Sequence, residues 1–133
     1  MSMRRILVVE DSASTRSFIR SALESSGHLG VFDIVEASSG FDALRLLPRG
    51  PYDLVITDIN MPDINGLELV QFIRKSDRHR STALLIISTQ SSEKDRMRGL
   101  SLGADEYLAK PLSADVLVSA VNRLISSGPA ASG

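Results

Sequence analysis

Three acidic residues and one lysine stand where apolar stretches of this sequence end: Glu10, Asp11, Asp58 and Lys110. Asp58 follows Leu-Val-Ile-Thr at 54–57, and the acidic pair follows Ile-Leu-Val-Val at 6–9. A carboxylate placed where a buried strand meets solvent is costly to bury and often serves chemistry. If these strands are parallel neighbours, their carboxyl ends share one edge of the sheet. Such a group of charges suits a hard divalent cation and a phosphoryl group.

The acidic residues predict a magnesium site. Mg²⁺ prefers oxygen ligands and keeps several of its waters. Asp11 and Asp58 can offer carboxylate oxygens, the backbone carbonyl of Asn60 can offer a third, and Glu10 can hold a metal-bound water. We therefore expect Mg²⁺ as the cofactor.

With a metal in place, Asp58 would be the nucleophile toward a phosphoryl donor and would form an acyl phosphate. The metal and Lys110 would neutralise the charge on the equatorial oxygens. Ser88 ends the fourth apolar run and could donate a hydrogen bond to a phosphoryl oxygen.

Each residue taken alone has a second interpretation. Asp58 could cap a turn or a helix, and Glu10–Asp11 could cap the helix that starts near residue 14. Lys110 alone is better explained as a surface residue, and Ser88 as an ordinary hydroxyl at a strand end. The functional interpretation rests on their joint placement at the ends of four strands.

Apolar runs alternate with helical patterns five times along the chain. We predict strands at 6–9, 31–37, 53–57, 83–87 and 106–109, and helices at 14–26, 41–47, 67–75, 92–102 and 113–125. This alternation predicts an α/β fold, a doubly wound parallel sheet with helices on both faces. Ligands bind such sheets outside the carboxyl ends of the strands.

Composition narrows the function classes. The 133 residues fit one domain, and 15 Lys plus Arg nearly balance 16 Asp plus Glu. This balance gives no case for nucleic acid or an anionic membrane as a partner. With no Cys there is no thiolate metal site or thiol nucleophile, and no apolar run approaches the ~20 residues that span a bilayer. We expect a soluble, cytoplasmic domain.

Four motifs together resemble the receiver domains of bacterial response regulators, especially single-domain, chemotaxis-type (CheY-like) members. They are Val-Val-Glu-Asp-Ser at 8–12, Asp-Ile-Asn-Met-Pro-Asp-Ile-Asn-Gly at 58–66, Ile-Ile-Ser at 86–88 and Gly-Ala-Asp-Glu-Tyr-Leu-Ala-Lys-Pro at 103–111. The resemblance implies a flavodoxin-like sheet of strand order 2-1-3-4-5 with five helices. It implies one receiver domain over 1–126, and 127–133 has the composition of a flexible tail.

The resemblance also implies the site roles. Asp58 matches the phosphoacceptor (4-aspartylphosphate), Asp11 a direct Mg²⁺ ligand, and Asn60 the residue whose main-chain carbonyl binds the metal. Lys110 matches the site lysine, with a cis bond to the proline that follows it. Besides catalysing its own phosphorylation and dephosphorylation, such a domain is not an enzyme.

The switch residues implied by the resemblance are Ser88 and Tyr107. Phosphorylation would draw Ser88 toward Asp58, and Tyr107 would rotate inward. The surface of the fourth helix, fifth strand and fifth helix would then change its preference for a partner. Taken without the resemblance, Tyr107 is a half-buried strand aromatic. Thr89 departs from the family, which usually has a small residue there, and its branched side chain could crowd Asp58.

The partners implied are a histidine kinase or phosphotransfer domain and a downstream protein target. Both a monomer and a phosphorylation-dependent dimer fit. Two other functions compete with this one. A scaffold of the same fold would dock without phosphorylation, and a phosphatase would use Asp58 as nucleophile. The phosphatase needs a second acid two residues on, where Asn60 cannot protonate a leaving group.

Overall fold

The computed structural model describes residues 4–26 and 32–126, which form five strands alternating with helices. The strands are β1 (Arg4–Val9), β2 (Phe32–Ala37), β3 (Leu54–Asp58), β4 (Ala83–Ser88) and β5 (Glu106–Ala109). The helices are α1 (Ala13–Glu24), α2 (Gly40–Leu46) with a 3-10 turn η2 (Leu47–Arg49), α3 (Gly66–Lys75), α4 (Glu93–Ser101) and α5 (Ala114–Ser126). Val31, predicted in the second strand, and the predicted tail 127–133 lie outside the described residues.

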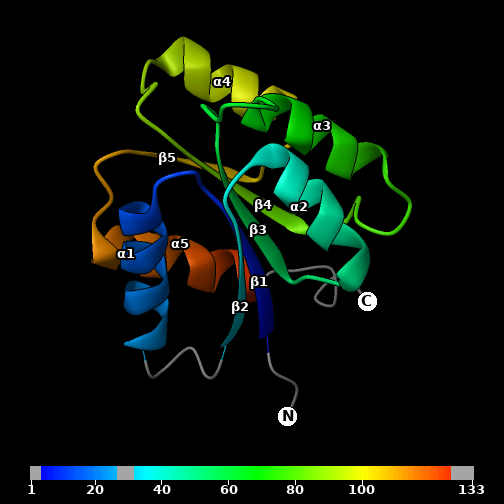
Figure 1. The fold of residues 1–133 in the computed structure, drawn as a ribbon. Helices are drawn as coiled ribbons and strands as arrows, with labels where there is room; N and C mark the ends of the chain where they lie inside the picture. Colours follow the sequence, from blue (N-terminus) through cyan, green and yellow to red (C-terminus); the bar gives the residue numbers. More distant parts are fainter. Residues whose placement is uncertain (1–3, 27–31, 127–133) are drawn as a thin grey trace.

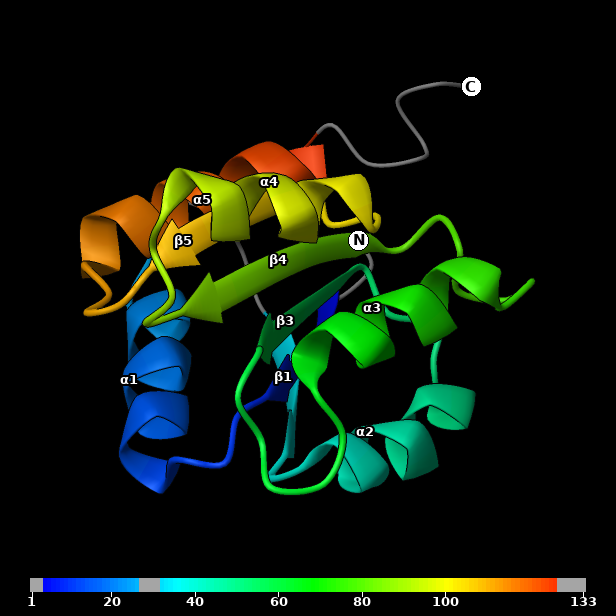
Figure 2. The same cartoon turned by 90° about the horizontal axis from the view of Figure 1, so that it is seen from above.

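The strands form one parallel sheet in the order β2-β1-β3-β4-β5, which confirms the predicted topology. Helices α1 and α5 cover one face, while α2, α3 and α4 cover the other (Figures 1 and 2). Because every crossover brings the chain back to start a parallel strand, all five carboxyl ends lie at one edge.

Each buried strand contributes to two separate cores. Along β1, Leu7 and Val9 pack in the core under α2 and α3, while Ile6 and Val8 pack in the core under α1 and α5. This alternation follows from the two-residue period of a strand. A strand covered on both faces therefore reads as a continuous apolar run, which is why these runs predicted strands so well.

The element ends differ from the predicted ones by one or two residues. β3 and β4 each extend one residue further at the carboxyl end than predicted, so Asp58 and Ser88 are the last residues of their strands. Helix α1 ends at Glu24 rather than at Ser26, because the hydroxyl of Ser26 donates to the carbonyl of Leu23 (2.7 Å) in a closing turn.

The loop between β3 and α3 is fixed at both of its ends. Asn65 and Glu68 form a capping box that starts α3. Asp63 lies in the loop itself and accepts hydrogen bonds from the backbone amides of Gly40 (3.0 Å) and Phe41 (2.8 Å) at the start of α2. The bond from Phe41, together with those from Ile64 and Gly40, lowers the pKa of Asp63 to about 2. The loop that follows Asp58 is thus anchored to α2.

This anchor predicts an acid-dependent loss of stability. The pKa of Asp63 is about 2 in the folded chain and about 3.9 when unfolded, so its contribution is complete above about pH 4 and is lost as pH falls toward 2. In Asp63→Asn an NH₂ replaces one acceptor oxygen. The variant should melt below the wild type at pH 7, and the difference should shrink steadily between about pH 4 and 2.

Thermal unfolding followed by circular dichroism from pH 2 to 7 measures this difference. Asp77→Asn is the matched control, because its side chain is 96% exposed and lies 3.9 Å from Arg80 as its ion-pair partner. A melting difference for Asp63→Asn that stays constant over the whole pH range would contradict the anchor.

Candidate functional site

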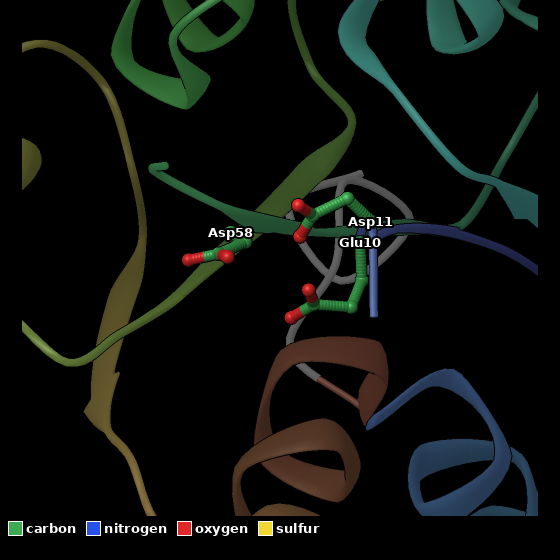
Figure 3. A group of neighbouring side chains, drawn as sticks. All are labelled: Glu10, Asp11 and Asp58. Carbon is green, nitrogen blue, oxygen red and sulfur yellow. The ribbon is translucent and has the colours of Figure 1, made fainter. Parts of the chain in front are cut away.

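The structure brings the predicted acidic residues together at the carboxyl edge of the sheet. Asp58 ends β3, and Glu10 and Asp11 follow β1, its neighbour in the sheet. One carboxylate oxygen from each of the three lies within 4.8 Å of the others, and Figure 3 shows the three side chains as neighbours. Glu10 and Asp58 are buried, whereas Asp11 is exposed to solvent.

Lys110 lies between the two buried carboxylates. Its ammonium donates to Glu10 Oε1 at 2.7 Å and to Asp58 Oδ2 at 3.2 Å. The position follows from β5, because the backbone amide of Lys110 donates to the carbonyl of Ser88 (2.8 Å). The bond from Lys110 to Pro111 is cis, as the resemblance implied. Residues 100 positions apart thus form one charged cluster.

Glu10 is held through both its backbone and its side chain. Its amide donates to Ala37 (3.0 Å) at the end of β2, and its second carboxylate oxygen accepts from the amide of Ser12 (3.0 Å). Burial raises the pKa of Glu10, and the hydrogen bond from Lys110 opposes that rise. Burial also disfavours the charged ammonium, but the bond to Glu10 and the charge of Asp58 outweigh it and raise the pKa of Lys110.

Asp58 is oriented by the turn that follows it. Its Oδ1 accepts from the amide of Ile59 (2.8 Å), while Oδ2 faces Lys110. Gly66 donates its amide to the Ile59 carbonyl (2.8 Å), and a Cβ at Gly66 would lie 2.0 Å from the Asp58 carbonyl oxygen. A glycine is therefore required where α3 starts, because the two backbones touch directly behind the site.

The β4–α4 loop forms the other wall of the site. Ser88 is fully buried, and its Oγ accepts from the amide of Gln90 (2.9 Å). The Gln90 side chain donates to the Asn60 side-chain carbonyl (3.3 Å), which links this loop to the loop after Asp58. Thr89 is exposed.

Tyr107 lies inward, under α4. Its side chain is 8% exposed, and its hydroxyl donates to the backbone carbonyl of Gln90. The ring is thus more deeply buried than the half-buried strand position that its sequence context alone suggests.

Two contributors to the site were not predicted from the sequence. Asp63 looked like a loop residue, and Arg16 like an ordinary residue of an amphipathic helix. The Arg16 guanidinium donates to the backbone carbonyl of Glu10 (2.6 Å) and to Glu36 on β2 (3.0 Å). One feature of the sequence could have indicated the role of Arg16. A cation in the first turn of a helix interacts unfavourably with the helix dipole, so an arginine there suggests a stabilising partner nearby.

The donor set suits a hard divalent cation. All three acidic side chains offer oxygen, which Mg²⁺ prefers, and one of them is open to solvent, where the metal can keep its waters. The site holds three carboxylates against one ammonium, so two negative charges remain when all of these groups are ionised. The residues present therefore fit Mg²⁺. Among the described residues, no helix has the length and apolar character needed to cross a membrane.

Comparison with known proteins assigns the family. Residues 6–122 match the response regulator receiver domain. A chemotaxis protein CheY homologue of Campylobacter jejuni is 31% identical, over 93% of this chain and 94% of its own. The structure of the chemotaxis response regulator CheY4 of Vibrio cholerae superposes with a TM-score of 0.83 at 28% identity, covering 92% of this chain and 99% of that one.

Transcriptional regulators also match. A probable transcriptional regulatory protein of Picosynechococcus is 40% identical over 128 residues, which are 91% of this chain and 49% of that protein. The regulator CusR of Escherichia coli is 32% identical, over 95% of this chain and 53% of its own. The chain therefore spans about half the length of these regulators and nearly all of the CheY homologue.

The matched range includes Glu10, Asp11, Asp58 and Lys110. The order of the strands in the sheet is also the predicted one. Receiver domains take part in signalling with histidine kinases and downstream targets and are not enzymes in the usual sense. This chain belongs to the response regulator receiver domain family of two-component signalling.

Proposed function

We propose that this receiver accepts a single phosphoryl group on Asp58 and passes the signal to a protein partner. The proposal rests on one observation: in a chain of this family, four charged residues lie close together at the carboxyl edge of the sheet, namely Glu10, Asp11, Asp58 and Lys110. The donor is a phosphohistidine of a kinase or phosphotransfer domain, or a small acyl phosphate. Residues 1–126 act as the receiver and 127–133 as a tail.

The chemistry follows from the positions of the charges. A carboxylate oxygen of Asp58 attacks phosphorus, a P–O bond forms, and the bond from phosphorus to the donor's imidazole or acetate breaks. Asp11, Asp58 and the backbone carbonyl of Asn60 would hold Mg²⁺ directly and Glu10 through a water. The metal would supply charge neutralisation at the phosphoryl oxygens. The Lys110 ammonium, now 3.2 Å from Asp58, contacts the same group.

The wall formed by Ser88 and Gln90 responds to the new charge. A phosphoryl group on Asp58 attracts the Ser88 hydroxyl, whose oxygen now accepts from Gln90. Because Gln90 also accepts from Tyr107, movement of this loop reaches β5. The structure described here has Tyr107 inward, the position that we assign to the active state.

The surface formed by α4, β5 and α5 is the proposed partner face. β5 is the edge strand of the sheet, and α4 and α5 flank it from opposite faces (Figure 2). Met97 on α4 and Val116 on α5 leave 56% and 51% of their area exposed, so the face offers apolar contacts. The protein acts there as a monomer or as a phosphorylation-dependent dimer.

Phosphorylation of Asp58 can be tested directly. Incubation with acetyl phosphate and Mg²⁺ should add one phosphoryl group, read by intact-mass spectrometry. Asp58→Asn should remain unlabelled because an amide is no nucleophile, and EDTA should prevent labelling of the wild type. Asp53→Asn is the matched control, because Asp53 precedes the same strand at its opposite end and should leave labelling intact.

Absence of an adduct has two distinguishable causes. If the small donor cannot reach the site past Thr89, beryllofluoride, which mimics a bound phosphoryl group, still forms a complex. Failure of both the adduct and the beryllofluoride complex would overturn the phosphoryl proposal and leave a docking module that works without phosphorylation.

Gly99 of α4 makes room for the inward ring of Tyr107. A Cβ at Gly99 would lie 2.9 Å from Tyr107 Cδ2 and 3.0 Å from Ile86 Cδ1. The absence of a side chain at this one helical position therefore creates the slot in which the ring lies. Any side chain there competes with the inward position of Tyr107.

A double-mutant cycle tests this slot. Gly99→Ala should destabilise the wild type by about 1–3 kcal/mol, because the added methyl overpacks the ring. In a Tyr107→Ala background the same change should stabilise by roughly 0.5–1 kcal/mol, because alanine is the better residue for a helix interior. Urea unfolding measures both. Equal effects in the two backgrounds would contradict the slot, and Asp58 labelling should survive in Gly99→Ala.

A further inference from the structure

Arg16 connects the acidic pair to the rest of the fold. From the first turn of α1, one of its terminal nitrogens donates to the carbonyl oxygen of Glu10 at 2.6 Å, while its Nε donates to a carboxylate oxygen of Glu36 at 3.0 Å. Its side chain is 18% exposed. A single guanidinium therefore joins α1, the loop after β1, and β2.

Arg20, one helical turn further on, provides a natural comparison. Its Nε donates to the other carboxylate oxygen of Glu36 at 2.7 Å, and another nitrogen donates to the carbonyl of Ile34 (3.0 Å). The bonds from Arg20, then from Arg16, lower the pKa of Glu36. Both arginines thus stabilise the same carboxylate on β2, but only Arg16 is hydrogen-bonded to the acidic pair.

The contact falls on the peptide that joins the two acidic residues. The carbonyl of Glu10 and the amide of Asp11 belong to one planar unit, so a fixed carbonyl oxygen fixes the direction in which the chain enters Asp11. The amide of Glu10 is already bonded to Ala37 (3.0 Å). With Arg16 on the carbonyl, the backbone at Glu10 is held on both sides, and exposed Asp11 projects from a fixed support.

We propose that Arg16 is a positioning residue for metal binding, which sets the orientation of Asp11 through the Glu10–Asp11 peptide. This inference rests on the proposed function, because it assumes that the acidic pair binds Mg²⁺. Removing a group that hydrogen-bonds to the ligands of a metal typically weakens metal affinity by about 10–100-fold, because such groups fix the orientation of the ligands. Arg16 reaches its two acceptors through two separate nitrogens of a rigid planar guanidinium, Nε and a terminal nitrogen, and the single nitrogen of a lysine ammonium cannot reproduce that spacing.

The test compares Mg²⁺ dissociation constants, by isothermal titration calorimetry, for the wild type, Arg16→Met and Arg20→Met. Urea unfolding in EDTA gives the stability of each chain without metal. We expect Arg16→Met to weaken Mg²⁺ binding by about tenfold or more. Arg20→Met should leave affinity unchanged while losing comparable stability, because both variants give up a hydrogen bond to Glu36. Arg16→Lys separates charge from geometry, and we expect it to bind Mg²⁺ weakly as well.

Several outcomes would overturn the inference. Unchanged affinity in Arg16→Met would show that the peptide needs no such support. Equal weakening in Arg16→Met and Arg20→Met would assign the effect to general loss of stability. Full Mg²⁺ affinity in Arg16→Lys would show that the positive charge alone suffices. This variant also decides the question if Arg16→Met does not fold. Failure of the wild type itself to bind Mg²⁺ would instead overturn the proposed function, and this inference with it.

Discussion

The site depends on two buried carboxylates sharing one ammonium. Glu10 and Asp58 are 1% and 5% exposed, and both contact Lys110. A buried ion needs a partner, because desolvation disfavours its charge. Burial is the chief cause of the raised pKa of Glu10, and the neighbouring carboxylates of Asp11 and Asp58 add to the rise. One ammonium cannot balance these three carboxylates. The folded chain is thus left with a charge imbalance that a divalent cation would correct. In the proposed function, a phosphoryl group would then add negative charge at the same point.

The parallel sheet is what places these charges together. Strands buried on both faces satisfy their backbones through the ladder and leave polar groups at their ends. Asp58 ends β3 and the acidic pair follows β1, its neighbour, so no long loop is needed to bring them within reach. The lysine comes from the far side of β4 and is held by the hydrogen bond of its own amide to Ser88. The ladder register therefore sets the geometry of the charges.

Much of this arrangement could be predicted from the sequence. Continuous apolar runs revealed the strands, and the acidic residues and Lys110 stood at their ends. What could not be predicted depends on side chains that meet across the fold. Arg16 and Asp63 have ordinary local contexts, and their partners lie on other elements. Gly99 shows no turn signal, because its role is to leave space for Tyr107. Periodicity reports burial, but it carries no information on which particular atoms meet.

The two walls of the site differ in how firmly they are held. Beside β1, the Glu10 backbone is bonded to Ala37 and Arg16, and its side chain to Ser12 and Lys110. Beside β4, the exposed Gln90 is joined to its surroundings through Ser88, Asn60 and Tyr107. A charge added at Asp58, as proposed, would meet a fixed acidic wall and a wall whose polar contacts can be exchanged. Each of these three hydrogen bonds of Gln90 involves a hydroxyl or a side-chain amide, so the bonds can be exchanged without opening the core. The proposed phosphoryl signal would therefore travel toward β5, where Tyr107 lies, and not back into α1.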